Sequence, residues 1–86
     1  MNTYTLRYAR SAEKDLERLP AQIVLRVQHA IRELAANPRP PGYKKLKGYE
    51  NTYRLRVGKY RVLYEVDDKT VTVLIVRIRN RKDAYP

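Results

Sequence analysis

The chain has 86 residues, which is the size of one small domain, and we expect residues 1–86 to fold as a single unit. It has no cysteine, which excludes a disulfide framework and a thiolate metal site. We find no secretion-signal pattern at its start and no apolar run longer than residues 73–76, and we therefore expect a soluble, cytoplasmic protein without a membrane partner. Nineteen Lys and Arg against nine Asp and Glu give a net charge of +10, and such an excess attracts polyanions.

The first elements are a strand and a helix. Apolar residues alternate with polar ones over residues 3–8, which predicts a strand. Ser11 offers an N-cap for a helix in which Ala12, Leu16 and Leu19 form an apolar stripe.

A second helix follows almost at once. Pro20 either ends the first helix or opens the second from its first position, which we favour. His29 falls on the solvent-facing side of the second helix, where we interpret it as an ordinary surface residue. Because the joint between the two helices is very short, they should form an antiparallel hairpin. The apolar stripe of this helix consists of Ile23, Val27, Ala30, Ile31 and Leu34.

The second half of the chain reads as strands. Residues 37–42 contain three prolines and must be a loop. Apolar and polar residues then alternate through residues 53–57 and 60–66, and residues 71–79 form a last long strand. Tight turns at residues 58–59 and 67–69 make this an antiparallel meander. The order strand, helix, helix, meander predicts an α+β fold with both helices on one face of the sheet.

The alternation also predicts a cationic surface. If the apolar residues of 53–57 face the helices, Arg54 and Arg56 project from the other face, and Arg61 joins them from the next strand. The tail at residues 77–82 adds further cations. A solvated face that discourages edge pairing is the alternative interpretation. Arginine outnumbers lysine here, which favours phosphate recognition, because arginine grips phosphate bidentately and stacks on bases.

The residue inventory excludes several nuclease mechanisms. A single histidine rules out a two-histidine ribonuclease, and sparse, unclustered carboxylates rule out a two-metal site. We therefore expect neither a metal nor a cofactor. RNA can still be cut by in-line attack of its own 2′-hydroxyl, provided that the protein orients it, stabilises the developing charge and helps protons to move.

The residues that carry a family resemblance span nearly the whole chain. They are the opening strand with Ala9-Arg10-Ser11-Ala12, the helical hairpin, the segment KLKGYENTYRLRVGKYRVLYEVDD and the closing IRNRKDAYP. In this order they resemble the RelE/ParE toxin superfamily. The resemblance implies a central antiparallel sheet beside two N-terminal helices. It also implies the RelE-type activity, in which the toxin enters the ribosomal A site and cuts mRNA between codon bases.

The resemblance also implies residue roles. Arg54 would orient the phosphate, Arg61 and Arg81 would stabilise transition-state charge, and Tyr85 would stack on a base. Arg56 stands where the best-known RelE-type enzyme has a lysine taken as general base, so the base is unassigned, with Lys45, Lys47 and Lys59 as candidates or orientation alone as the source of catalysis. Many relatives carry a histidine where this chain has Asn80. The predicted catalytic residues are Arg56, Arg61, Arg81 and Tyr85, and the predicted RNA-binding residues are Arg54, Lys45, Lys47, Lys59 and Arg79.

The implied partners are the ribosome with its mRNA and an acidic, RelB-like antitoxin in a toxin–antitoxin hetero-oligomer. Two other functions stay open at this point. One is a ParE-like inhibitor of DNA gyrase, since a shared fold does not fix function. The other is a non-catalytic partner of RNA or of the ribosome, which the charge alone would satisfy.

Overall fold

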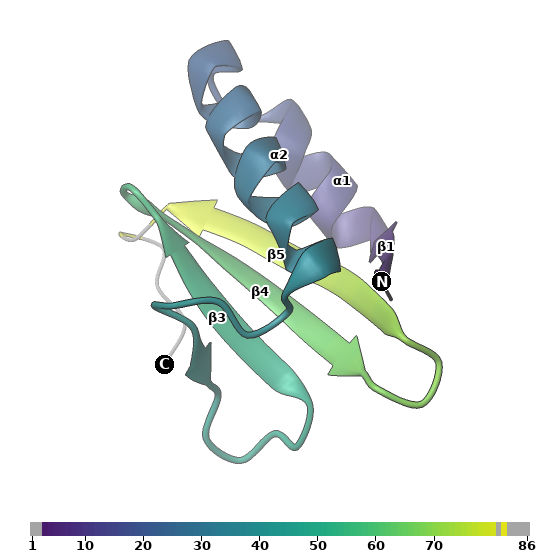
Figure 1. The fold of residues 1–86 in the computed structure, drawn as a ribbon. Coiled ribbons are helices and arrows are strands. Elements are labelled where there is room, and N and C mark those ends of the chain that lie inside the picture. The colour runs from purple at the N-terminus through teal and green to yellow at the C-terminus, as the bar shows by residue number, and fades with distance from the viewer. Residues whose placement is uncertain (1–2, 81, 83–86) are drawn as a thin grey trace.

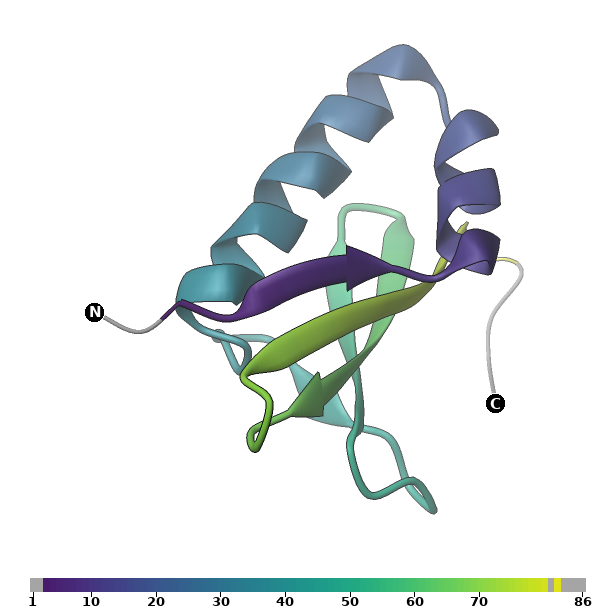
Figure 2. The same cartoon turned by 90° about the vertical axis from the view of Figure 1, so that its right-hand side faces the viewer.

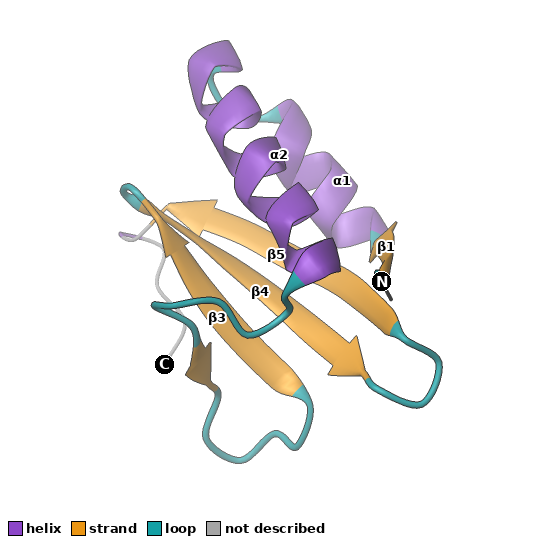
Figure 3. Cartoon of the chain, viewed as in Figure 1, coloured by secondary structure: helices purple, strands orange, loops and turns teal. Residues whose placement is uncertain are grey.

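The computed structural model describes residues 3–80 and residue 82. Within this part of the chain, five strands form one sheet in the order β1-β5-β4-β3-β2 (Figure 1). Both helices lie on the same side of that sheet (Figure 3). The predicted α+β class is thus confirmed. The elements in chain order are β1 (Thr5–Tyr8), α1 (Arg10–Glu17), α2 (Ala21–Ala36), β2 (Lys44–Lys45), β3 (Thr52–Val57), β4 (Tyr60–Asp67) and β5 (Thr72–Asn80).

The sheet is antiparallel except at one edge. β3, β4 and β5 form the expected meander, and Gly58, with φ +60°, supplies the left-handed conformation in the tight turn between β3 and β4. β1 runs parallel to β5, with Thr5 in register with Thr72. The chain reaches this position through the helical hairpin, which crosses above the sheet between β1 and the meander (Figure 2).

The hydrophobic core lies between α2 and the helix-facing side of the sheet. Tyr53, Leu55, Val62 and Tyr64 turn inward as the alternation predicted, and their polar neighbours are left on the opposite face. No helix in the described residues has the length and apolar character needed to cross a bilayer. The buried apolar residues are Ala12, Val27, Ile31, Leu34, Tyr53, Leu55, Val62, Tyr64, Val66, Val73, Ile75 and Ile78.

The helix starts differ from the prediction. Ala9, not Ser11, is the N-cap residue of α1, and the Ser11 hydroxyl instead donates to the carbonyl oxygen of Val76 at 2.7 Å. Pro20 is the N-cap residue of α2 and precedes its first helical position. The prediction of Ser11 as the N-cap was wrong. The pairing of β1 with β5 ends at Ile75, and Ser11 donates to the next carbonyl of β5 instead. A backbone partner so distant in the sequence leaves no local sequence signal.

The strand β2 and both ends of β5 also differ from the prediction. The two-residue strand β2 is too short to show any alternation in the sequence. β5 begins at Thr72, because Val71 takes a left-handed conformation with φ 52° and closes the preceding turn. At its other end β5 continues one residue further than expected, to Asn80.

Candidate nucleic-acid interface

Three arginines on neighbouring strands form one row across the sheet face that points away from the helices. Arg56 of β3 is in register with Arg61 of β4, and Arg61 is in register with Arg79 of β5. Cross-strand neighbours have their Cβ atoms about 5 Å apart, so the Cβ atoms of these three residues are neighbours across the strands. We refer to Arg56, Arg61 and Arg79 as the arginine row.

A pocket of about 300 Å³ opens beside this row. Lys44 of β2 is in register with Arg54 of β3, which places a fourth and a fifth cation next to Arg56 and Arg61. The described residues that line this pocket include four cations and no carboxylate, a lining suited to an anion. The lining residues of this cationic pocket are Gly42, Lys44, Arg54, Arg56 and Arg61.

The cationic pocket carries an electrostatic cost. Like charges directly opposite each other on antiparallel strands are destabilising. Arg56 is exposed, whereas Arg54 and Arg61 are half-buried. A bound phosphate would offset this repulsion and accept paired N–H donors from the guanidinium groups.

The lysines predicted from the sequence lie elsewhere. Lys45 is in register with the buried Tyr53, on the helix-facing side of the sheet. Lys59 is exposed in the hairpin turn, and Lys47 lines a separate groove. Of the lysines that the structure describes, Lys44 is the one that lines the cationic pocket. Sequence reasoning missed it because β2 was not predicted, and without that strand nothing distinguishes Lys44 from Lys45.

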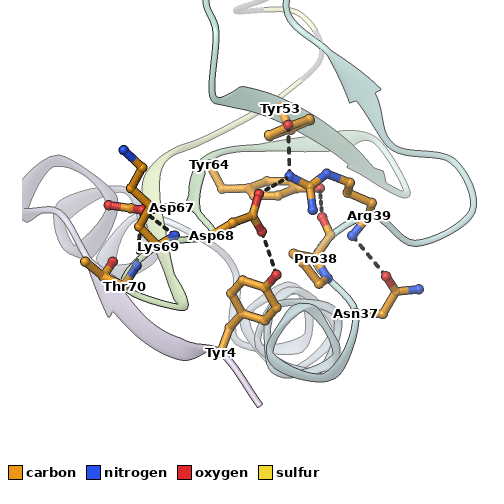
Figure 4. A network of polar contacts seen from close by, with 10 residues as sticks. All are labelled: Tyr4, Asn37, Pro38, Arg39, Tyr53, Tyr64, Asp67, Asp68, Lys69 and Thr70. Carbon is orange, nitrogen blue, oxygen red and sulfur yellow. Dashed lines mark hydrogen bonds and ion pairs between the residues drawn. The ribbon is translucent and has the colours of Figure 1, made fainter. Parts of the chain in front are cut away.

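A network of polar contacts fixes the loop that leads to Lys44 (Figure 4). The Arg39 guanidinium donates from Nη2 to Asp68 Oδ2 at 2.9 Å and to the Tyr53 hydroxyl at 3.2 Å. The Tyr4 hydroxyl donates to the second carboxylate oxygen of Asp68 at 2.6 Å. Asp68, in the β4–β5 turn, therefore connects the loop at residues 37–42 with Tyr4, the residue before β1.

The same network shifts ionisation equilibria. Hydrogen bonds from Arg39 and then Tyr4 hold the pKa of Asp68 below its ordinary value. Burial raises the pKa of Tyr64, whose hydroxyl donates to the Pro38 carbonyl at 2.7 Å. These groups keep the carboxylate charged and the phenol neutral, so the loop is held in place at neutral pH.

The C-terminal end of β5 is held by α1. β1 covers β5 only as far as Ile75, and beyond it the side chain of Asp15 takes the place of a strand. Its Oδ2 accepts from the Ile78 backbone N–H at 2.8 Å and from Arg77 Nε at 3.0 Å, and Asp15 is only 7% exposed. This contact, which the sequence did not reveal, anchors the strand that carries Arg79.

Two predicted site residues cannot be placed. Arg81 and Tyr85 lie outside the described residues. Arg79 lies in the arginine row, as expected from its position on the last strand, and it also borders a shallow hollow with Arg18 and Asn80.

A model of the family described as the ParE toxin of the type II toxin–antitoxin system parDE matches residues 6–85. The chain belongs to the RelE/ParE family of type II toxins. The toxin is 36% identical over 83 residues to Toxin RelG of Mycobacterium tuberculosis, covering 95% of each chain. It is 37% identical over 82 residues to Toxin RelE3 of Methanocaldococcus jannaschii, covering 91% of each.

Solved structures of toxin–antitoxin complexes resemble the toxin closely. The RelBE2 complex of Mycobacterium tuberculosis matches with a TM-score of 0.84 and 35% identity, covering 94% of each chain. The archaeal RelE–RelB complex of Pyrococcus horikoshii matches with a TM-score of 0.83 and 30% identity, covering 95% of this chain and 99% of the other. The resemblance inferred from the sequence is confirmed, and the toxin is of the RelE type.

Proposed function

We propose that this toxin is a ribosome-dependent endoribonuclease that cuts mRNA in the A site and so stops translation. The observation that carries the proposal is the cationic pocket, where Arg54, Arg56 and Arg61 converge with Lys44 on one sheet face. The similarity to toxins of the RelE type supports the same activity, which the resemblance to that family implies.

The proposed reaction is a transesterification within the RNA. The 2′-hydroxyl gives up its proton to water as its oxygen forms a bond to the adjacent phosphorus. The bond from phosphorus to the 5′-oxygen breaks and that oxygen takes up a proton, so the products are a 2′,3′-cyclic phosphate and a 5′-hydroxyl. Arg54 orients the phosphate, and Arg56 and Arg61 stabilise the extra negative charge on its oxygens. Arg81 and Tyr85 keep their expected roles in charge stabilisation and base stacking.

We assign proton donation at this site to Lys44, a residue that the sequence analysis did not single out. The lysines proposed earlier, Lys45, Lys47 and Lys59, are not among the described residues that line the cationic pocket, whereas Lys44 is. A protonated Lys44 can donate to the departing 5′-oxygen, since an ammonium group has three N–H donors.

We further propose an acidic antitoxin of the RelB type as the partner that silences the toxin. The solved relatives include RelE–RelB complexes, and a chain with net charge +10 offers electrostatic complementarity to an acidic protein. Such a complex would be a hetero-oligomer.

The test is cleavage of mRNA by purified toxin on programmed ribosomes. The wild type should cut within the A-site codon, and Arg61→Ala and Arg81→Ala should cut at least about 100-fold more slowly. Intact mRNA with the wild type would refute the proposal.

A gyrase supercoiling assay tests the second candidate function, because the matching family model is named for ParE. Inhibition of supercoiling without mRNA cleavage would establish that function instead. Salt-sensitive ribosome binding without either activity would leave a non-catalytic partner.

A further inference from the structure

A second hollow on the same sheet face has a different chemistry. It has a volume of about 520 Å³, within the range of small-molecule sites, and its apolar walls are Leu46, Tyr49, Leu63 and Val76. Polar groups stand among them: Lys47, Thr52 and Glu65. We refer to this hollow as the Tyr49 groove.

The helical core does not account for these apolar side chains. Leu63 is in register with Arg54 and is flanked along β4 by the buried Val62 and Tyr64, so it lies on the face turned away from the helices. Tyr49 is 60% exposed. Apolar side chains gathered on an exposed face of a small basic protein indicate a contact surface.

The loop that carries Tyr49 is anchored at its base. The Leu46 N–H donates to the Thr52 carbonyl at 2.9 Å, and the Tyr49 N–H donates to the Leu46 carbonyl at 3.3 Å. Gly48 has φ +84°, the positive value that a turn of this kind requires at its third residue. The ring of Tyr49 is thus presented at the groove by a defined turn.

The Tyr49 groove is continuous with the cationic pocket. Arg54 lines the pocket and Leu63 lines the groove, and these two residues are directly opposite each other on β3 and β4. Successive outward residues on a strand are about 6.6 Å apart, so the groove lies within one nucleotide of a phosphate in the pocket. The positive end of this face suits a phosphate, and the end with Glu65 suits the N–H donors of a base.

We propose that the Tyr49 groove binds a nucleobase of the RNA strand whose phosphate occupies the cationic pocket. The base stacks on Tyr49 and contacts Leu63 and Val76. Glu65 accepts a hydrogen bond from an exocyclic amino group, which would make the groove a determinant of base preference. This inference rests on the proposed function and adds to it a base-binding subsite.

The experiment is a double-mutant cycle between protein and RNA on programmed ribosomes. One set of mRNAs carries a single abasic nucleotide at each position flanking the scissile bond. The toxin variants are Tyr49→Ala, Tyr49→Phe as the rescue that keeps a flat ring, and Leu25→Ala. Leu25 is 69% exposed on α2, on the other side of the sheet, and serves as the matched control.

The expected result is coupling between Tyr49 and the RNA base at one position, and none at the others. Removing the stacked base should raise the toxin concentration needed for half-maximal cleavage by the wild type by roughly 5- to 150-fold. The same removal should have little effect on the concentration that Tyr49→Ala needs. Tyr49→Phe and Leu25→Ala should behave as the wild type does.

If the losses caused by the abasic nucleotide and by Tyr49→Ala were additive at every position, the inference would be overturned. Cleavage by the wild type would still support the proposed function. The groove would then serve another occupant, such as apolar side chains of an antitoxin. Absence of cleavage by the wild type would remove the proposed function and the inference together.

Discussion

Arg56 and Arg61 stand directly opposite each other across the β3–β4 hairpin, one residue from the turn on each strand. Two arginines in such a position repel each other, and Arg79 extends the row to a third strand. We interpret the row as a preformed phosphate site.

Replacing Arg56 should therefore separate activity from stability. We expect Arg56→Ala to slow mRNA cleavage on programmed ribosomes by about 100-fold or more, because one charge-stabilising donor is lost. Its free energy of unfolding should stay unchanged or rise by a few tenths of a kcal/mol in urea denaturation. Arg32→Ala, an exposed arginine on α2, is the control and should change neither quantity. A large loss of stability in Arg56→Ala would contradict this interpretation.

Lys44 and Lys45 provide a test with adjacent residues. Lys44 lines the cationic pocket, whereas Lys45 is in register with Tyr53 on the other face. We expect Lys44→Ala to lower the cleavage rate by about 100-fold, in the range typical of a lost proton donor, and Lys45→Ala to leave it nearly unchanged. Equal effects of the two substitutions in the same ribosome assay would argue against the role given to Lys44.

Asp15 should matter for stability. Asp15→Ala leaves the buried N–H of Ile78 without its acceptor and removes the ion pair with Arg77, so we expect a loss of about 1–3 kcal/mol in the free energy of unfolding. Glu13→Ala, at an exposed position on the same helix, should stay within about 0.5 kcal/mol of the wild type. Chemical denaturation measures both, and similar values for the two variants would show that the β5 edge needs no such anchor.

Stability should also depend on pH through Asp68. Its pKa is lowered by Arg39 and Tyr4, so its contribution is complete above the unfolded-state pKa of about 4 and is lost as the pH falls through the lower folded-state pKa. We expect the Tm of the wild type to fall in this acidic range and that of Asp68→Asn to fall less steeply.

The Tm of Asp68→Asn should still fall to some extent at acidic pH. Backbone N–H groups of Thr70 and Lys69 also lower the pKa of Asp67. Glu50→Gln, an exposed control, should reproduce the full wild-type slope. An Asp68→Asn profile parallel to the wild type would exclude the network as a source of acid sensitivity.

Local pattern was enough to predict β3, β4 and β5, the strands that carry the arginine row. The alternation of Tyr53, Leu55 and Val57 with arginines assigned each side chain to its face, because a strand has a period of two residues. The register of Arg56 with Arg61 then follows from the two-residue turn at residues 58–59.

Long-range contacts could not be predicted in the same way. Ser11 and Asp15 use their side chains on the backbone of β5, more than 60 residues away, and Lys44 enters the pocket through a strand of two residues. Such contacts depend on where the helical hairpin and the loop come to rest over the sheet. No periodicity in the sequence reports that placement.

The most direct test of the central claim is a structure of the toxin on a programmed ribosome whose mRNA has a 2′-methoxy group in place of the attacking hydroxyl, so that cleavage cannot proceed. Our account predicts an mRNA phosphate within about 3 Å of the guanidinium nitrogens of Arg56 and Arg61. An mRNA that instead lies against α1 and α2, with the arginine row turned away from it, would contradict the account.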